Sequence, residues 1–158
     1  MWFRLQIDPA YPPSRQTVYL QVSSPRALLI ISSAGTLHPT VSNYIKENLS
    51  LRALIPAISV SASGQLTGSP INANSGEDVL DAYRARASSK PDIVLGPDSH
   101  ATLSFTSGST GIPKGVKGRH YSLTHFFPWM SERFQLGPEA KFTMLSGIAH
   151  DPIQRDSE

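Results

Sequence analysis

Residues 102–118 read Thr-Leu-Ser-Phe-Thr-Ser-Gly-Ser-Thr-Gly-Ile-Pro-Lys-Gly-Val-Lys-Gly. A β-prone run at 101–105 leads directly into a loop of serine, threonine and glycine. Six of the ten residues from 102 to 111 are Ser or Thr, and glycines let a backbone approach a ligand closely. Successive backbone N–H groups in such a loop can form an anion-binding nest. Together with the hydroxyls and the cation of Lys114, this pattern suits a polyphosphate, whose oxygens need many donors.

Outward from this loop the sequence alternates between β-prone and helical patterns, which predicts an α/β layer structure. We expect strands at 17–22, 26–31, 54–60, 93–95, 101–105 and 141–145. The run 26–31 is apolar on both faces, which is typical of a buried parallel strand. Helices are predicted from Pro39, with Val41, Tyr44, Ile45 and Leu49 on one face, at 77–87 and at 122–134, where Pro128 should interrupt the helix. Residues 8–16, with three prolines, predict an extended turn-rich segment, and 61–76 a surface loop or hairpin tip.

The composition excludes several classes of protein. The 158 residues suit one domain, and 14 Lys and Arg against 12 Asp and Glu leave a net charge of only +2, which does not indicate nucleic-acid binding. With no cysteine there is no disulfide, thiol nucleophile or Cys-ligated zinc. The longest strongly apolar run, 27–31, is far too short to span a membrane. We therefore expect a cytoplasmic protein with no membrane or nucleic-acid partner.

Other chemistries are less well supported. The five histidines lack the helical spacing of metal ligands, since His120 and His125 lie about 140° apart around a helix, so we expect no metal site. There is neither a Gly-x-Ser-x-Gly elbow nor a Walker A loop. The basic cluster of Lys114, Lys117, Arg119 and His120 is interpreted as a solvated edge beside a phosphate site. The plain alternative for the whole stretch is a flexible Ser/Gly loop between a strand and a helix.

Residues 106–115, Thr-Ser-Gly-Ser-Thr-Gly-Ile-Pro-Lys-Gly, resemble the phosphate-loop signature of the adenylate-forming (AMP-binding) superfamily, which includes acyl-CoA synthetases, luciferases and peptide-synthetase adenylation domains. Residues 7–15 are similar to the Asp-Pro-x-Tyr-Pro segment of amino-acid-activating members. Residues 118–122 and 142–156 resemble the branch that activates L-2-aminoadipate in fungal lysine biosynthesis. The resemblance implies an α/β fold, an incomplete N-terminal subdomain of the adenylate-forming fold. It divides the chain into a divergent N-terminus (1–6), a partial adenylation domain (7–156) with a loop insertion near 61–76, and a divergent end (157–158).

The resemblance also implies a chemistry. ATP would adenylate the side-chain carboxylate of L-2-aminoadipate and release pyrophosphate. The acyl group would then pass to a phosphopantetheine thiol and be reduced with NADPH to the semialdehyde. The ATP phosphates would be bound by Thr106, Ser107, Gly108, Ser109, Thr110, Gly111, Lys114 and Gly115, and the substrate by Asp151, Pro152 and Arg155. A helix cap is an alternative role for Asp151, because Asp-Pro-Ile-Gln at 151–154 fits a helix start.

The sequence departs from the family pattern at both ends. The later nucleotide-pocket motifs, the acidic residue that helps to hold Mg²⁺ and the lid subdomain with its catalytic lysine are not found in it. Neither are the carrier and reductase domains that use phosphopantetheine and NADPH. We therefore expect a fragment or truncated gene product that has no complete set of catalytic residues and does not adenylate alone. The alternative is a noncatalytic module that binds a nucleotide or a partner.

Overall fold

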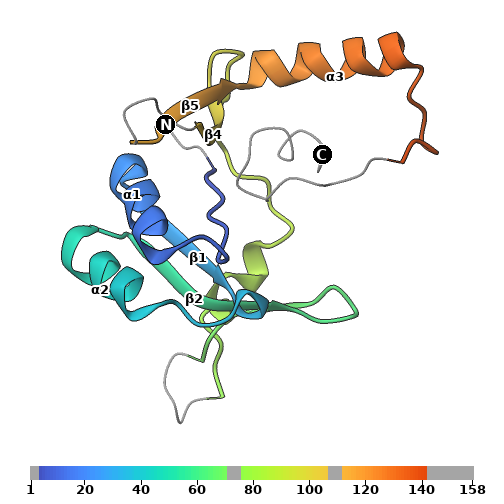
Figure 1. The fold of residues 1–158 in the computed structure, drawn as a ribbon. Coiled ribbons are helices and arrows are strands. Elements are labelled where there is room, and N and C mark those ends of the chain that lie inside the picture. Colours follow the sequence, from blue (N-terminus) through green and yellow to red (C-terminus); the bar gives the residue numbers. More distant parts are fainter. Residues whose placement is uncertain (1–3, 71–75, 107–111, 142–158) are drawn as a thin grey trace. The chain divides into compact units, whose positions relative to one another are not determined.

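The computed structural model describes residues 4–70, 76–106 and 112–141. The chain forms two compact units. Unit 1 consists of Met1–Ser23 and Val94–Glu158, and unit 2 of Ser24–Ile93. Both units combine helices with a small sheet, so the predicted α/β class is confirmed (Figure 1). Among the helices of the described residues, none has the length and apolar character that a membrane crossing requires.

Unit 1 is built around a β-hairpin. Strand β4 (His100–Thr106) pairs antiparallel with β5 (Lys114–Arg119), and β5 runs directly into helix α3 (His120–Phe134), as Figure 1 shows. The expected strand at 101–105 is confirmed. Strand β5 was not predicted, because its sequence, Lys-Gly-Val-Lys-Gly-Arg, has little β propensity. Pairing with β4 is what makes these residues extended.

The expected strand at 17–22 is wrong, because these residues belong to helix α1 (Pro13–Ser23). Pro13 stands at the first helical position, where its missing N–H costs nothing. Gln16, Tyr19 and Leu20 are the buried residues of α1, and their spacing of three and four places them on one helical face. Burial of that face outweighs the β propensity of Thr17, Val18 and Val22.

The core of unit 1 joins α1 to the hairpin. Tyr19, Leu103 and Phe105 form a buried cluster, against which Leu5, Ile7 and Tyr11 pack. The side chains of β4 alternate between two faces, and both faces hold a buried residue: Ser104 is 1% exposed, Leu103 4% and Phe105 5%. Leu103 and Phe105 lie on one face, and the hydroxyl residues Thr102, Ser104 and Thr106 lie on the other.

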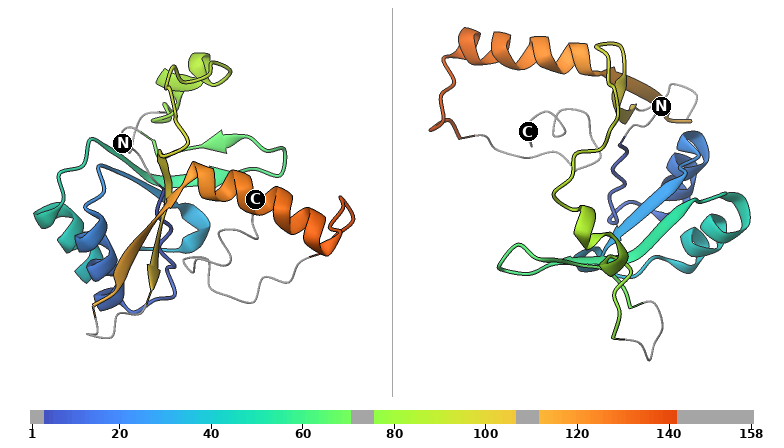
Figure 2. Two further views of the ribbon diagram at one scale, coloured as in Figure 1. Left: turned by 90° about the horizontal axis from the view of Figure 1, so that it is seen from above. Right: turned by 180° about the vertical axis from the view of Figure 1, so that it is seen from behind.

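Helix α3 confirms the helix expected at 122–134 and begins two residues earlier. It continues through Pro128 for six more residues, so the expected interruption does not occur (Figure 2). It ends where Gln135 adopts the left-handed conformation, at φ 53°.

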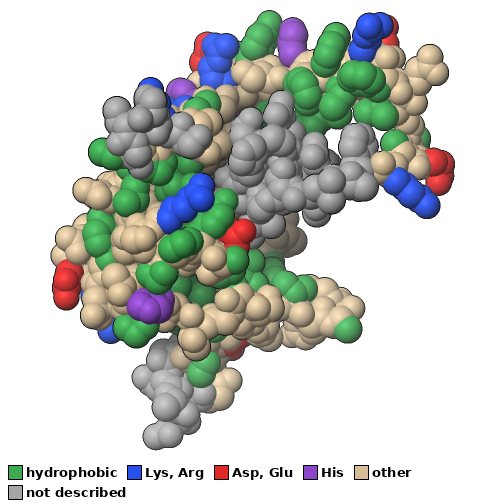
Figure 3. Space-filling view, viewed as in Figure 1, with side chains coloured by type: hydrophobic (Ala, Val, Ile, Leu, Met, Phe, Trp, Pro, Cys, Tyr) green, Lys and Arg blue, Asp and Glu red, His purple; other side chains and the backbone are tan. Residues whose placement is uncertain are grey.

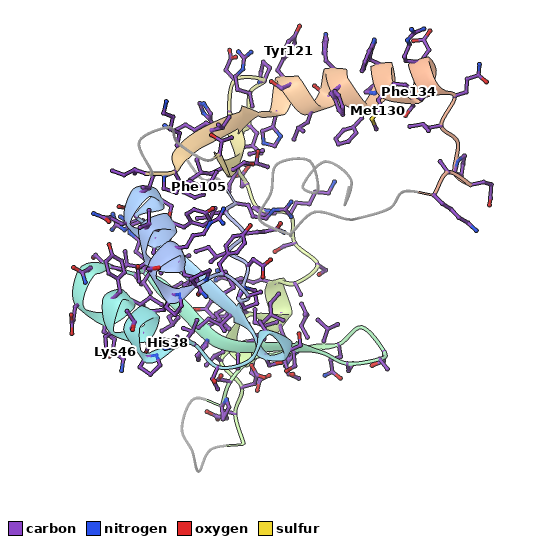
Figure 4. All side chains as sticks on the ribbon, in the orientation of Figure 1. His38, Lys46, Phe105, Tyr121, Met130 and Phe134 are labelled. Carbon is purple, nitrogen blue, oxygen red and sulfur yellow. The ribbon has the colours of Figure 1, made fainter. Side chains whose placement is uncertain are left out.

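Unit 2 contains a β–α–β arrangement. Strand β1 (Ala27–Ile31) lies parallel to β2 (Ala53–Val60), and helix α2 (Pro39–Asn48) connects them after the short 3₁₀ helix η1 (Ser32–Ala34). These elements confirm two predicted strands and the helix starting at Pro39. His38, labelled in Figure 4, caps α2: its Nδ1 accepts a hydrogen bond from the Thr40 N–H at 3.2 Å. Val41 and Ile45 form the buried face of α2.

The burial predicted for 26–31 is wrong. Strand β1 is parallel, as expected, but Leu29 and Ile31 expose 59% and 55% of their surface. Within the described residues, β1 pairs only with β2, so one of its edges and part of its surface stay uncovered.

The remainder of unit 2 is irregular. A turn at 61–65 joins β2 to β3 (Leu66–Thr67), so the first part of the expected loop at 61–76 is a hairpin tip, whereas 71–75 lie outside the described residues. The expected helix at 77–87 is shortened to a 3₁₀ helix, η2 (Asp81–Arg86).

The expected strand at 93–95 is wrong: these residues belong to no strand of the described part of the chain, and Val94 is 97% exposed. Pro91 and Pro97 flank the run and cannot donate to a ladder. In the expected strand at 141–145, Lys141 is not in a strand, and 142–145 lie outside the described residues.

Candidate functional site

The candidate site is the loop end of the β4–β5 hairpin. Thr106 pairs with Lys114 and Phe105 with Gly115, so the two strands bring the flanks of the phosphate-loop signature together. Residues directly opposite in an antiparallel ladder share a face of the sheet. The side chains of Thr106 and Lys114 therefore lie on the same face of the hairpin, and both residues are exposed. Residues 107–111 lie outside the described part of the chain.

Lys114 carries the positive charge of this site. In the described residues it forms no ion pair, whereas Arg119, five residues further along β5, binds Asp98 with Nη1 and Oδ1 2.8 Å apart. The residues of the basic cluster, although close in the sequence, therefore do not form a single basic surface beside the loop. Lys114 lies at the loop end of β5, Arg119 at its far end and His120 in α3. Of these three basic residues, Lys114 is the one that adjoins the loop.

Two glycines allow β5 to lie close to its neighbours. A Cβ on Gly115 would lie 3.1 Å from Leu103 Cδ1 and 3.7 Å from the Phe105 ring. A Cβ on Gly118 would overlap Thr102 Oγ1. Both glycines are therefore explained by close packing, and neither has a positive φ.

The base of the site rests on an aromatic stack. Phe105, labelled in Figure 4, stacks on Tyr19 of α1 with ring centroids 4.2 Å apart and planes 5° from parallel. Their exposures are 5% and 2%. This stack was not foreseen from the sequence. The spacing of Gln16, Tyr19 and Leu20 was the available signal, because it marks a helical face.

The remaining expected site residues lie outside the described part of the chain. These are Ser107, Gly108, Ser109, Thr110 and Gly111 in the loop, and Asp151, Pro152 and Arg155 near the C-terminus. Their roles stay predictions. Elsewhere in unit 1, Trp129, Glu132, Arg133 and Gln135 line a surface depression at the end of α3 that is farther from β5. Because this depression lies at the far end of α3, it is not part of the candidate site at the hairpin loop. Within the described ranges, no three His, Asp or Glu side chains are grouped as metal ligands.

Comparison with known proteins defines the class. The chain belongs to the family of AMP-binding enzymes, whose sequence pattern matches residues 3–153. It is 53% identical to L-2-aminoadipate reductase of Schizosaccharomyces pombe, 54% to that of Saccharomyces cerevisiae and 57% to the large subunit from Penicillium chrysogenum. Each match covers 95% of this chain, but the chain spans only 10–11% of the relative's length. Surfactin synthase subunit 2 of Bacillus subtilis is 31% identical over 63% of the chain. The resemblance predicted from the sequence is confirmed.

Proposed function

We propose that this chain provides the ATP-phosphate-binding part of an adenylation domain that activates L-2-aminoadipate. The observation that carries the proposal is the ladder pair of Thr106 and Lys114, which places a hydroxyl residue and a lysine opposite each other where the strands enter the signature loop. The family membership and the identity to L-2-aminoadipate reductases of three fungi support the choice of nucleotide and substrate.

The residues present fit a polyphosphate. A carboxylate is a poor electrophile, and adenylation gives it a leaving group, pyrophosphate. Negative charge builds on that group as it departs, so donors fixed at its oxygens stabilise the transition state. Lys114 would supply the charge, and Thr106, Ser107, Ser109 and Thr110 the hydroxyl donors. Gly108 and Gly111 would bring backbone N–H groups to the phosphates.

We assign no step to protein-held magnesium, although Mg²⁺ would accompany ATP, because the described residues hold no cluster of suitable ligands. Transfer to phosphopantetheine and reduction by NADPH would be carried out by other domains.

The test of nucleotide binding is a calorimetric titration of the 158-residue chain with ATP. Lys114→Ala should weaken binding about 10- to 150-fold, the effect of losing one charge-assisted hydrogen bond. Lys117→Ala is the matched control, because Lys117 lies on the same strand but pairs with Leu103, away from the loop. Equal losses in the two variants would mean that only the overall charge of the hairpin matters.

Catalysis is tested separately, by ATP–pyrophosphate exchange that depends on L-2-aminoadipate. Exchange that is abolished by Lys114→Ala would show that the chain adenylates. ATP binding without exchange fits both the adenylation fragment proposed here and the alternative, a noncatalytic nucleotide-binding module, so only positive exchange distinguishes the two.

Substrate recognition is proposed for Asp151 and Arg155. When the side-chain carboxylate of aminoadipate faces the phosphate, its ammonium and α-carboxylate need one anion and one cation from the protein. Arg can bind a carboxylate through two parallel hydrogen bonds. Arg155→Leu should therefore weaken binding of L-2-aminoadipate about 10- to 150-fold. It should hardly affect 5-aminopentanoate, which lacks the α-carboxylate. If both ligands weaken equally, Arg155 is structural.

A further inference from the structure

We propose that Tyr19 is a positioning residue for the phosphate loop, and that the segment 8–19 supports a loop almost ninety residues away in the sequence. This inference rests on the proposed function, since it names the residues that hold the ATP-binding loop in place. Three sets of contacts within unit 1 carry it.

The first set links Tyr19 to both flanks of the loop. The Tyr19 ring lies parallel to the Phe105 ring, 4.2 Å away between centroids, and both are buried. Phe105 immediately precedes Thr106, and its partner across the hairpin, Gly115, immediately follows Lys114. A shift of the Tyr19 ring would therefore move the Phe105–Gly115 pair, which is adjacent to the Thr106–Lys114 pair at the loop.

The second set fixes the orientation of Tyr19. Its hydroxyl oxygen accepts a hydrogen bond from Arg15 Nε at 2.9 Å. The Arg15 guanidinium also lies over the Tyr11 ring, 4.2 Å from its centroid, and Tyr11 meets Tyr19 edge to face at 5.9 Å. Phenylalanine would fill the same buried space. The hydroxyl with its charged donor additionally restrains the ring within its plane, beyond what packing requires.

The third set anchors Tyr11. The side chain of Gln16, only 7% exposed, donates hydrogen bonds to the backbone oxygens of Tyr11 at 2.7 Å and Pro9 at 3.2 Å. Asp8 Oδ1 accepts the Ala10 N–H at 2.9 Å and closes the turn. The Asp-Pro-Ala-Tyr-Pro turn is thus tied to α1, and α1 to the loop, through Tyr11, Tyr19 and Phe105.

The experiment compares Tyr19→Leu, which removes the stack, with Tyr19→Phe, which keeps it. Tyr44→Leu, the same change at a half-buried tyrosine of α2 in unit 2, is the matched control.

Amide hydrogen exchange of the 158-residue chain is followed by NMR at low temperature, and ATP affinity is measured on the same samples. In Tyr19→Leu, amides of 103–106 and 114–117 should exchange about tenfold faster, the effect of a lost aromatic pair. Those of 100–102 and 118–119 should change less.

The affinity for ATP should fall about three- to tenfold in Tyr19→Leu. Tyr19→Phe should recover most of both effects, and Tyr44→Leu should show neither. Phe105→Leu should reproduce Tyr19→Leu, and the double variant should add little to either. Tyr11→Leu, which removes only the edge contact, should give a smaller change in the same direction.

Uniform acceleration over the whole hairpin, or loss of the fold in Tyr19→Leu without a local effect in Tyr11→Leu, would make Tyr19 an ordinary core residue and overturn the inference. Unchanged exchange at 103–106 would do the same. If the wild-type chain does not bind ATP but exchange responds locally, the coupling stands and the proposed function is refuted.

Discussion

Gly118 is a position in the hairpin where a larger side chain would not fit without a shift of its neighbour. It lies opposite Thr102 in the ladder, where a Cβ would overlap Thr102 Oγ1. The four glycines of the 102–118 stretch suggest loop flexibility from the sequence alone. In the structure Gly115 and Gly118 belong to β5, and the lack of a Cβ at these positions leaves room for side chains of β4 to pack closely.

We expect Gly118→Ala to destabilise unit 1 by about 1–3 kcal/mol, the usual cost of overpacking. Thr102→Ala removes the overlapping oxygen, so the double variant Thr102→Ala/Gly118→Ala should recover most of the loss. Amide hydrogen exchange of the β4 and β5 residues in the four proteins measures both effects. Strictly additive changes would show that the two side chains do not meet.

At the scale of the element, charged side chains hold the 3₁₀ helix η2 in place through hydrogen bonds and an ion pair. Asp78 Oδ1 accepts the Leu80 N–H at 2.8 Å, and Oδ2 accepts the Gly68 N–H at 2.6 Å. Asp81 receives the Arg84 guanidinium at 2.5 Å, and Arg84 also donates to the Leu66 oxygen at 3.2 Å. These contacts hold β3 and η2 together, although no residue of η2 is buried.

The Arg84 guanidinium holds the pKa of the Asp81 carboxyl below its ordinary value, and a hydrogen bond from the Asp78 N–H adds to this. Because the folded pKa is lowered, the contribution of the pair to stability is present above the unfolded pKa of about 3.9. It is lost as the pH falls through the lower folded value. The pair is exposed, so the effect on stability is small.

We expect an NMR titration of the side-chain carboxyl carbons to find the Asp81 pKa below that of an ordinary aspartate. Arg84→Gln should raise it toward the ordinary value. Arg86→Gln, in the same 3₁₀ helix, is the control and should leave it unchanged. An Asp81 pKa that does not respond to Arg84→Gln would mean that the ion pair does not form in solution.

At the scale of the whole molecule, burial is limited. Among the described residues, the buried hydrophobic side chains are Tyr19, Leu20, Val41, Ile45, Leu103 and Phe105, whereas sixteen large hydrophobic residues are exposed. Figure 3 shows hydrophobic side chains gathered along α3, where Trp129 and Phe134 are 55% and 63% exposed. Exposed apolar area contributes nothing to the free energy of unfolding.

We therefore expect the isolated chain to unfold in a broad, weakly cooperative transition, with the two units losing structure separately. Far-ultraviolet circular dichroism should report both units. The NMR ring signals of the stacked Tyr19 should report unit 1, and the two curves should not coincide. A single sharp transition by both probes would contradict this expectation. A concentration series controls for association.

The sequence by itself determined the α/β class, the β1–α2–β2 pattern, the long helix after the loop and the family. Each of these depends on local signals: an apolar run, a proline at a helix start, helical spacing at 123–134 and the order of residues in 106–115. Two of its failures, at β5 and α1, share one cause. Strand β5 and helix α1 contradict their local propensities because Lys114–Arg119 pairs with β4, and because Tyr19 is buried against Phe105.

The tertiary structure alone decided how the flanks of the loop meet. The pairing of Thr106 with Lys114, the stack beneath it and the difference between Lys114 and the paired Arg119 join residues far apart in the chain. Such contacts depend on burial and on strand register, which no short window of sequence contains. The sequence therefore predicted a phosphate loop, and folding determined which residues flank it.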